Sequence, residues 1–121
     1  ALTVANGVTI SGNISMTGSG DIFYNGAGTT VTLSGNVDLG TQIHSLNVLN
    51  GPATVDLLFS GVISGTGGVT KISTGTVQFS GASPNTYSGL TTVNAGIFLL
   101  NKTAGINAIA GDILVNGGTL T

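Results

Sequence analysis

Apolar residues occur along the chain in short alternating runs, each followed by small polar residues and glycine. Alternation with a period of two is typical of a β-strand that has one face buried. One pattern of two outer apolar residues around a middle position, followed by Ser-Gly, occurs four times, and weaker copies begin at Ile97 and Leu120. The copies begin at residues 8, 31, 57, 77, 97 and 120. A repeat of 20 to 26 residues predicts a stack of similar units.

Asn-Gly pairs distinguish between two all-β architectures. Such pairs between strands usually indicate an antiparallel hairpin, which would suit a β-sandwich. Here Asn6-Gly7, Asn25-Gly26, Asn50-Gly51 and Asn116-Gly117 each fall shortly before a repeat start. A solenoid needs the same sharp corner in every coil, and both residues tolerate left-handed backbone angles. We therefore predict a parallel β-helix (solenoid) of about five coils as one domain, residues 1–121, with an antiparallel sandwich as the alternative.

The strand pattern predicts which side chains stack inside the solenoid. The first residue of each copy should form one inward row and the third residue a second row. The first row would contain Val8, Val31, Leu57, Val77 and Ile97. The second row would contain Ile10, Leu33, Phe59, Phe79 and Leu99. At about 4.8 Å per coil, five coils would make a rod about 24 Å long.

The chain has few charged residues, which argues against some classes of function. The chain has two basic and four acidic residues, so that 5% of residues are charged. A surface with so few charges does not favour electrostatic binding to nucleic acid or to an anionic membrane. Cysteine is absent, which excludes disulfides and thiolate metal sites. No apolar run approaches membrane-spanning length, so we expect neither nucleic-acid binding nor membrane insertion.

The segment from Gly61 to Leu100 resembles the autotransporter-associated β-strand repeat, also called the passenger-associated transport repeat. The similarity is carried by "GTGGVTKISTGTVQFSG" followed by "NTYSGLTTVNAGIFLL", and it includes Lys71, Asn85 and Tyr87. Ser83-Pro84 is inserted where the family usually runs from "SGA" directly to "NTY". The resemblance implies a right-handed parallel β-helix, a bacterial secreted or cell-surface location, and a role in adhesion or surface structure. A structural job is implied for Tyr87.

Catalytic groups are few. Parallel β-helices include polysaccharide lyases and hydrolases, and hydrolysis of this kind usually needs paired carboxylates. Asp38 and Asp56 are 18 residues apart and could meet on adjacent coils, but we expect solvated acids at turns or outward strand positions. Lys71 and Lys102 are expected to be surface lysines, and His44 a loop or wall residue. We predict no enzymatic activity, no cofactor and no metal site.

Two large apolar residues lie at the middle position of their copies, where alternation points outward. They are Leu58 and Phe98, and they indicate an interface, a shifted register or a covering loop such as residues 40–49. Both ends of the chain are strand-like and carry little charge. We expect end-to-end self-association, either as a head-to-tail fibre or between neighbouring coils of a longer chain. The candidate contact residues are Leu2, Val4, Leu58, Phe98, Ile113, Val115 and Leu120. An adhesin module that binds an extracellular ligand is the alternative function.

Overall fold

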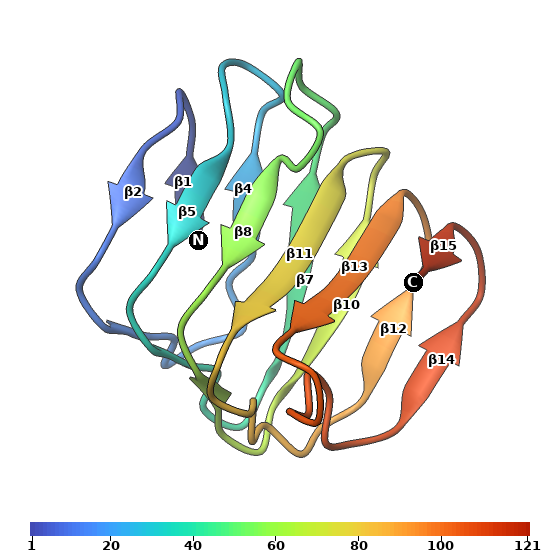
Figure 1. The fold of residues 1–121 in the computed structure, drawn as a ribbon. Helices are drawn as coiled ribbons and strands as arrows, with labels where there is room; N and C mark the ends of the chain where they lie inside the picture. Colours follow the sequence, from blue (N-terminus) through green and yellow to red (C-terminus); the bar gives the residue numbers. More distant parts are fainter.

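Fifteen β-strands and no helix make up the computed structural model, which describes residues 1–121. Every pairing between strands is parallel. The chain therefore winds as a parallel β-solenoid of about five coils, which confirms the predicted fold class, and the sandwich alternative is wrong (Figure 1). The right-handed winding stays an expectation from the family resemblance.

Three sheets form the sides of the solenoid. The first sheet contains β1 (Leu2–Val4), β4 (Ile22–Tyr24), β7 (Ile43–Val48), β10 (Gly68–Ile72), β12 (Thr91–Val93) and β14 (Ile113–Val115). The second contains β2 (Thr9–Ile10), β5 (Val31–Leu33), β8 (Leu57–Phe59), β11 (Thr76–Gly81), β13 (Ile97–Lys102) and β15 (Thr119–Leu120). The third contains β3 (Ile14–Ser15), β6 (Val37–Asp38) and β9 (Ile63–Ser64).

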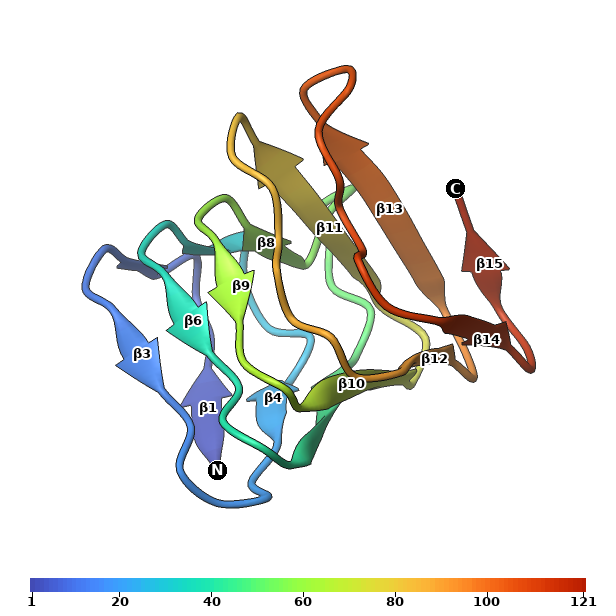
Figure 2. The same ribbon diagram turned by 90° about the horizontal axis from the view of Figure 1, so that it is seen from below.

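The third side changes along the rod. In the first three coils it is a strand, as Figure 2 shows from below. After β11 and β13 the chain instead closes the coil with the non-strand segments 82–90 and 103–112. Asn85 continues the third sheet's hydrogen bonding without a strand, since its Oδ1 accepts from the amide of Ile63 (2.9 Å) and its Nδ2 donates to Ala108 O (2.9 Å). Its side chain thus connects the third coil to the fifth.

The core consists of rows of residues that are paired from coil to coil. Two rows of the second sheet face the core, and the first of them is Val31, Leu57, Val77, Phe98 and Leu120. The second is Ile10, Leu33, Phe59, Phe79 and Leu100. Phe79 packs edge-on against Phe59 (ring centroids 5.4 Å apart), Phe98 (4.7 Å) and Tyr87 (6.3 Å). This aromatic cluster fills the centre of the rod.

The predicted register of the fifth coil is wrong by one residue. Val77 pairs with Phe98 rather than with Ile97, and Phe79 pairs with Leu100 rather than with Leu99. Ile97 is 40% exposed, whereas Phe98 is fully buried. Four consecutive apolar residues leave both alternations possible, and burying the larger phenylalanine ring removes more apolar surface from water. Val8, also predicted to face inward, is 46% exposed because it lies outside β2 in the end coil.

Close stacking between coils explains why glycine follows serine in the repeat. A Cβ atom on Gly35 would overlap the carbonyl oxygen of Gly12, and one on Gly61 would overlap that of Gly35. The predicted corner chemistry is present in part. Asn6 and Gly7 both have left-handed backbone angles (φ 58° and 67°), and in the fourth coil Ser73 takes this conformation (φ 65°).

Candidate functional site

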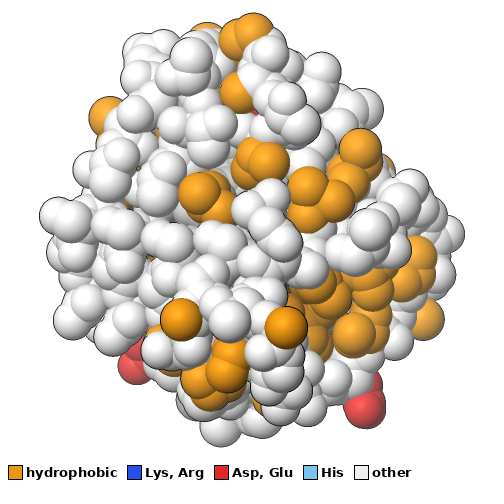
Figure 3. All heavy atoms as spheres, viewed as in Figure 1, with side chains coloured by type: hydrophobic (Ala, Val, Ile, Leu, Met, Phe, Trp, Pro, Cys, Tyr) orange, Lys and Arg blue, Asp and Glu red, His pale blue; other side chains and the backbone are white.

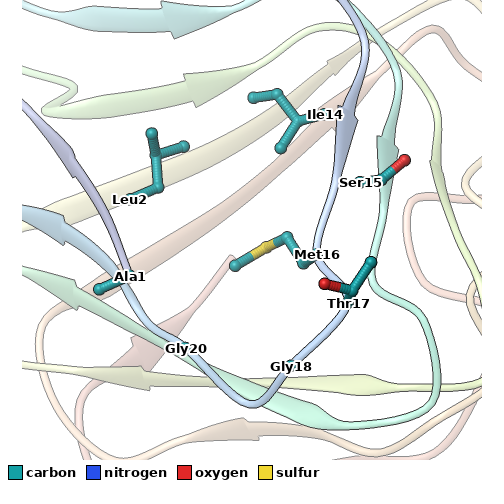
Figure 4. Close-up of a pocket in the computed structure, with 8 residues that line it drawn as sticks. All are labelled: Ala1, Leu2, Ile14, Ser15, Met16, Thr17, Gly18 and Gly20. Atoms are coloured by element: carbon teal, nitrogen blue, oxygen red, sulfur yellow. The ribbon is translucent and has the colours of Figure 1, made fainter.

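The end formed by the first coil is open and largely apolar. A hollow of about 360 Å³ lies there, beside the N-terminus (Figure 4). Its lining consists of Ala1, Leu2, Ile14, Ser15, Met16, Thr17, Gly18 and Gly20. The side chains of Leu2, Ile14 and Met16 lie toward this hollow. None of the side chains that line the hollow is charged, and its polar groups are the backbone, the Ala1 amino group and the hydroxyls of Ser15 and Thr17.

The opposite end is also apolar. The three residues of β14 are all exposed, Ile113 at 44%, Leu114 at 46% and Val115 at 47%. Figure 3 shows apolar side chains gathered on the side where Figure 1 places the C-terminal end. β14 and β15 are the last strands of their sheets, so one edge of each has no strand partner. Such an edge is a template for pairing with another strand.

The structure places the other predicted contact residues differently. Phe98 lies inside the core, so the expectation that it points outward is wrong and the shifted register is the correct interpretation. Val4 is buried at 4% exposure, and only the edge of its strand is free. Leu58 lies half-buried on the outer face of the second sheet, between Thr32 and Gln78. Leu2 and Leu120 are half-buried at opposite ends of the rod.

A buried polar cluster lies beneath the corner where the first sheet turns into the second. Asp56 is fully buried, and its two carboxylate oxygens accept from the amides of Gly51 and Thr76, each at 2.8 Å. The expectation of a solvated aspartate at this position is therefore wrong. Because both oxygens are occupied by backbone donors, Asp56 positions the chain and is not free to act as a general base.

Lys71 lies in the same region and is not a surface lysine as expected. It occupies the inward row of the first sheet, between Leu46 and Val93, and is fully buried. Its ammonium donates to the carbonyls of Ile72 and Ser73, both at 2.8 Å. Burial lowers the pKa of Lys71 to about 8, and the charge of Asp56 opposes this shift. Burial, with the Asp56 charge as a second cause, raises the pKa of Tyr24.

His44 and Lys102 also bind backbone carbonyls. The region predicted as a covering loop, residues 40–49, contains β7, and His44 is a buried wall residue within it. Its ring nitrogens lie 2.7 Å from Gly20 O and 2.7 Å from Leu39 O. Lys102 is half-buried and donates to Ser80 O at 2.8 Å, and burial lowers its pKa. These side chains connect turns of the coil through backbone carbonyls.

The remaining acids do not assemble a site. Asp38 is exposed, and its carboxylate accepts from the amide of Gly40 at 2.8 Å. No three His, Cys, Asp or Glu side chains lie together in a way that could hold a metal ion. The structure has no helix, and hence none that could span a membrane.

Alternation could have revealed the buried polar residues. Lys71 follows Val69 by two positions, and His44 precedes Leu46 and Val48 at the same phase, so both are in phase with inward apolar residues. The charge of Lys71 led the prediction to place it at the surface, whereas His44 was predicted as a loop or wall residue. Asp56 had no such signal, because it lies just before β8, in a corner loop.

Comparison with known proteins adds one relative. Over 90 residues, 73% of the chain, the sequence is 37% identical to the adhesin BmaC autotransporter of Brucella suis biovar 1 (strain 1330). The chain is similar to a small segment of that adhesin. It spans only 2% of the adhesin's length. No family model and no solved structure matches the chain.

Proposed function

We propose that the chain is a segment of a bacterial cell-surface adhesin of the autotransporter type. The similarity to BmaC carries this proposal, since it extends over most of the chain and includes regions beyond the "NTYSG" motif. The fold supports it, because a parallel solenoid makes an extended rod that can present loops far from a cell surface.

Adhesion by the isolated segment tests this proposal. Beads carrying the 121-residue chain should bind cultured epithelial cells more strongly than beads carrying an unrelated protein of equal size and charge. In cells that produce the protein, an antibody to the segment should label intact cells, and external protease should remove the label. Beads that bind no better than the control, or a label that requires permeabilised cells, would contradict the proposal.

Head-to-tail assembly is a second candidate function, favoured because the apolar row at one end of the rod could continue into the row at the other end of a second copy. The inward row of the first sheet begins at Leu2 and ends at Val115. Placing Leu2 of a second copy on Val115 would continue this row and pair β1 with β14. The same contact would fill the hollow beside Leu2 with apolar side chains. Because the two ends differ, the contact is heterologous and extends into a filament.

A lysine placed at the C-terminal end of the first sheet's inward row tests head-to-tail assembly. Light scattering should show particles that grow with protein concentration, and electron microscopy should show filaments. Val115→Lys should keep the chain monomeric, because stacking would bury an unpaired ammonium. Ile43→Lys is the matched control, since Ile43 is 56% exposed at the start of β7, in the middle of the first sheet and away from both of its end strands. A wild-type chain that stays monomeric, or equal effects of the two substitutions, would contradict end stacking.

A further inference from the structure

Two corner loops of the solenoid are longer than the others. The turn from the first sheet to the second uses residues 25–30 in the second coil and residues 49–56 in the third. In the fourth, fifth and sixth turns the same corner takes only residues 73–75, 94–96 and 116–118. Figure 1 shows the two long loops side by side, projecting beyond the strands at the top of the molecule. We refer to residues 25–30 and 49–56 as the corner loops.

Hydrogen bonds hold the corner loops to each other and to the wall. The hydroxyl of Thr30 donates to Val55 O at 2.6 Å, which joins the first loop to the second. Tyr24, buried beneath them, donates to Gly28 O at 2.8 Å. Asp56 binds Gly51 within the second loop and Thr76 in the next coil. Ordered loops on a rigid scaffold lose little conformational entropy on binding, which is the usual basis of loop recognition surfaces.

The exposed side chains of the corner loops carry no charge. They are Asn25, Ala27, Thr29, Leu49, Asn50, Pro52 and Thr54. The one charged residue of the loops, Asp56, is buried beneath them. Charged residues are depleted at the centre of protein–protein interfaces, and the exposed surface of the corner loops shares this depletion. Asparagine amides also form hydrogen bonds with varied geometry, as in antibody loops.

We propose that the corner loops are the ligand-contact surface of the segment and that their partner is an uncharged patch on a protein. A protein is favoured over a glycan or a small molecule because the loops have no exposed aromatic ring for a sugar to stack on. They also line no cavity, since the hollow of the structure lies at the first coil instead. This inference rests on the proposed adhesin function and names the part of the segment that makes contact.

Bead adhesion to cultured epithelial cells tests the corner loops directly. Replacing Leu49, Pro52 and Thr54 together by alanine should lower the bead-binding affinity by about tenfold or more, as loss of central interface residues does. The matched control replaces Ser83, Pro84 and Thr86, which are equally exposed in the loop after β11, and should change binding less than about twofold. Far-UV circular dichroism of each variant should show an unchanged melting temperature.

The chemistry of the partner is tested with the same beads. Trypsin treatment of the cells should remove binding, whereas mild periodate, which oxidises sugars, should leave it intact. Raising salt from about 0.05 to 0.5 M should change binding little, because no charge pair is screened. Sensitivity to periodate and not to trypsin would overturn the protein partner. Wild-type binding that survives the three corner-loop substitutions would overturn the site alone, whereas beads that never bind would contradict the adhesin function itself.

Discussion

Substituting Lys71 with methionine should remove an unusual alkaline gain in stability. Lys71 has no exposed surface, and burial lowers its pKa in the folded protein to about 8 from the ordinary 10.5. Between these two values the unfolded chain holds a proton that the folded chain has released. Stability therefore rises with pH in this window, because unfolding must take up a proton.

The size of the gain follows from the two pKa values. The full difference corresponds to roughly 3 kcal/mol, and about 2 kcal/mol of it appears between pH 7 and pH 9.5. Above pH 10 the sign reverses. Burial raises the pKa of Tyr87 to about 12, so the unfolded tyrosine loses its proton first and stability falls. The free energy of unfolding should therefore peak near pH 9.5 to 10.

Urea unfolding followed by circular dichroism at pH 7, 8, 9 and 9.5 measures this profile. Lys71→Met keeps an apolar chain of similar length in the row between Leu46 and Val93, and its profile should be flat to pH 9.5. Lys102→Met is the control, because Lys102 is only half-buried and its removal should leave the rise in place. A flat wild-type profile, or a rise of equal size in Lys71→Met, would refute the reasoning.

Three further predictions concern packing and catalysis. Phe79→Ala removes the central ring of the aromatic cluster and should cost about 3 to 5 kcal/mol in urea unfolding, and a cost below about 1 kcal/mol would contradict the described register. Gly61→Ala should lower the melting temperature, since the added Cβ overlaps the carbonyl of Gly35, whereas Gly18→Ala, with open space around it, should not. Purified protein should release no product from acidic or neutral polysaccharides, and turnover that Asp38→Asn abolishes would show that an enzymatic site exists.

The period of the sequence pattern predicted the architecture because every coil of the solenoid must meet the same structural requirements. Each coil must turn, bury two alternating apolar residues and accept a neighbour closely stacked on it, so the same pattern recurs at Val31, Leu57 and Val77. The prediction fails where apolar and polar residues no longer alternate. The run from Ile97 to Leu100 is apolar at both phases, so the sequence does not show that Phe98 is the residue that packs against Phe79 in the core.

Alternation could have indicated that Lys71 and His44 face inward, but not which groups they bind there, because a sequence pattern does not locate backbone acceptors and donors. Burying an ammonium is unfavourable unless acceptors surround it. The carbonyls of Ile72 and Ser73 provide them at a corner where Ser73 adopts a left-handed backbone angle. Likewise, Asp56 is stable in the interior because two backbone amides point at its carboxylate. The candidate surface was missed for a similar reason, since the length of the corner loops becomes apparent only once the strand ends are known.

The distribution of charge connects the structure to the proposed function. The chain has only two basic and four acidic residues, and Lys71 and Asp56 are both fully buried at corners between the first and second sheets. Their charges hold turns of the backbone in place and contribute little to the field outside the molecule. The face in Figure 3 accordingly shows mainly uncharged atoms, with acidic groups at its lower margin. Contact with a partner, whether through the corner loops or the rod ends, must then depend on shape, hydrogen bonds and apolar burial. Such contacts persist at high salt and weaken when a charge is placed within them, which is why single charged substitutions discriminate most sharply between the surfaces.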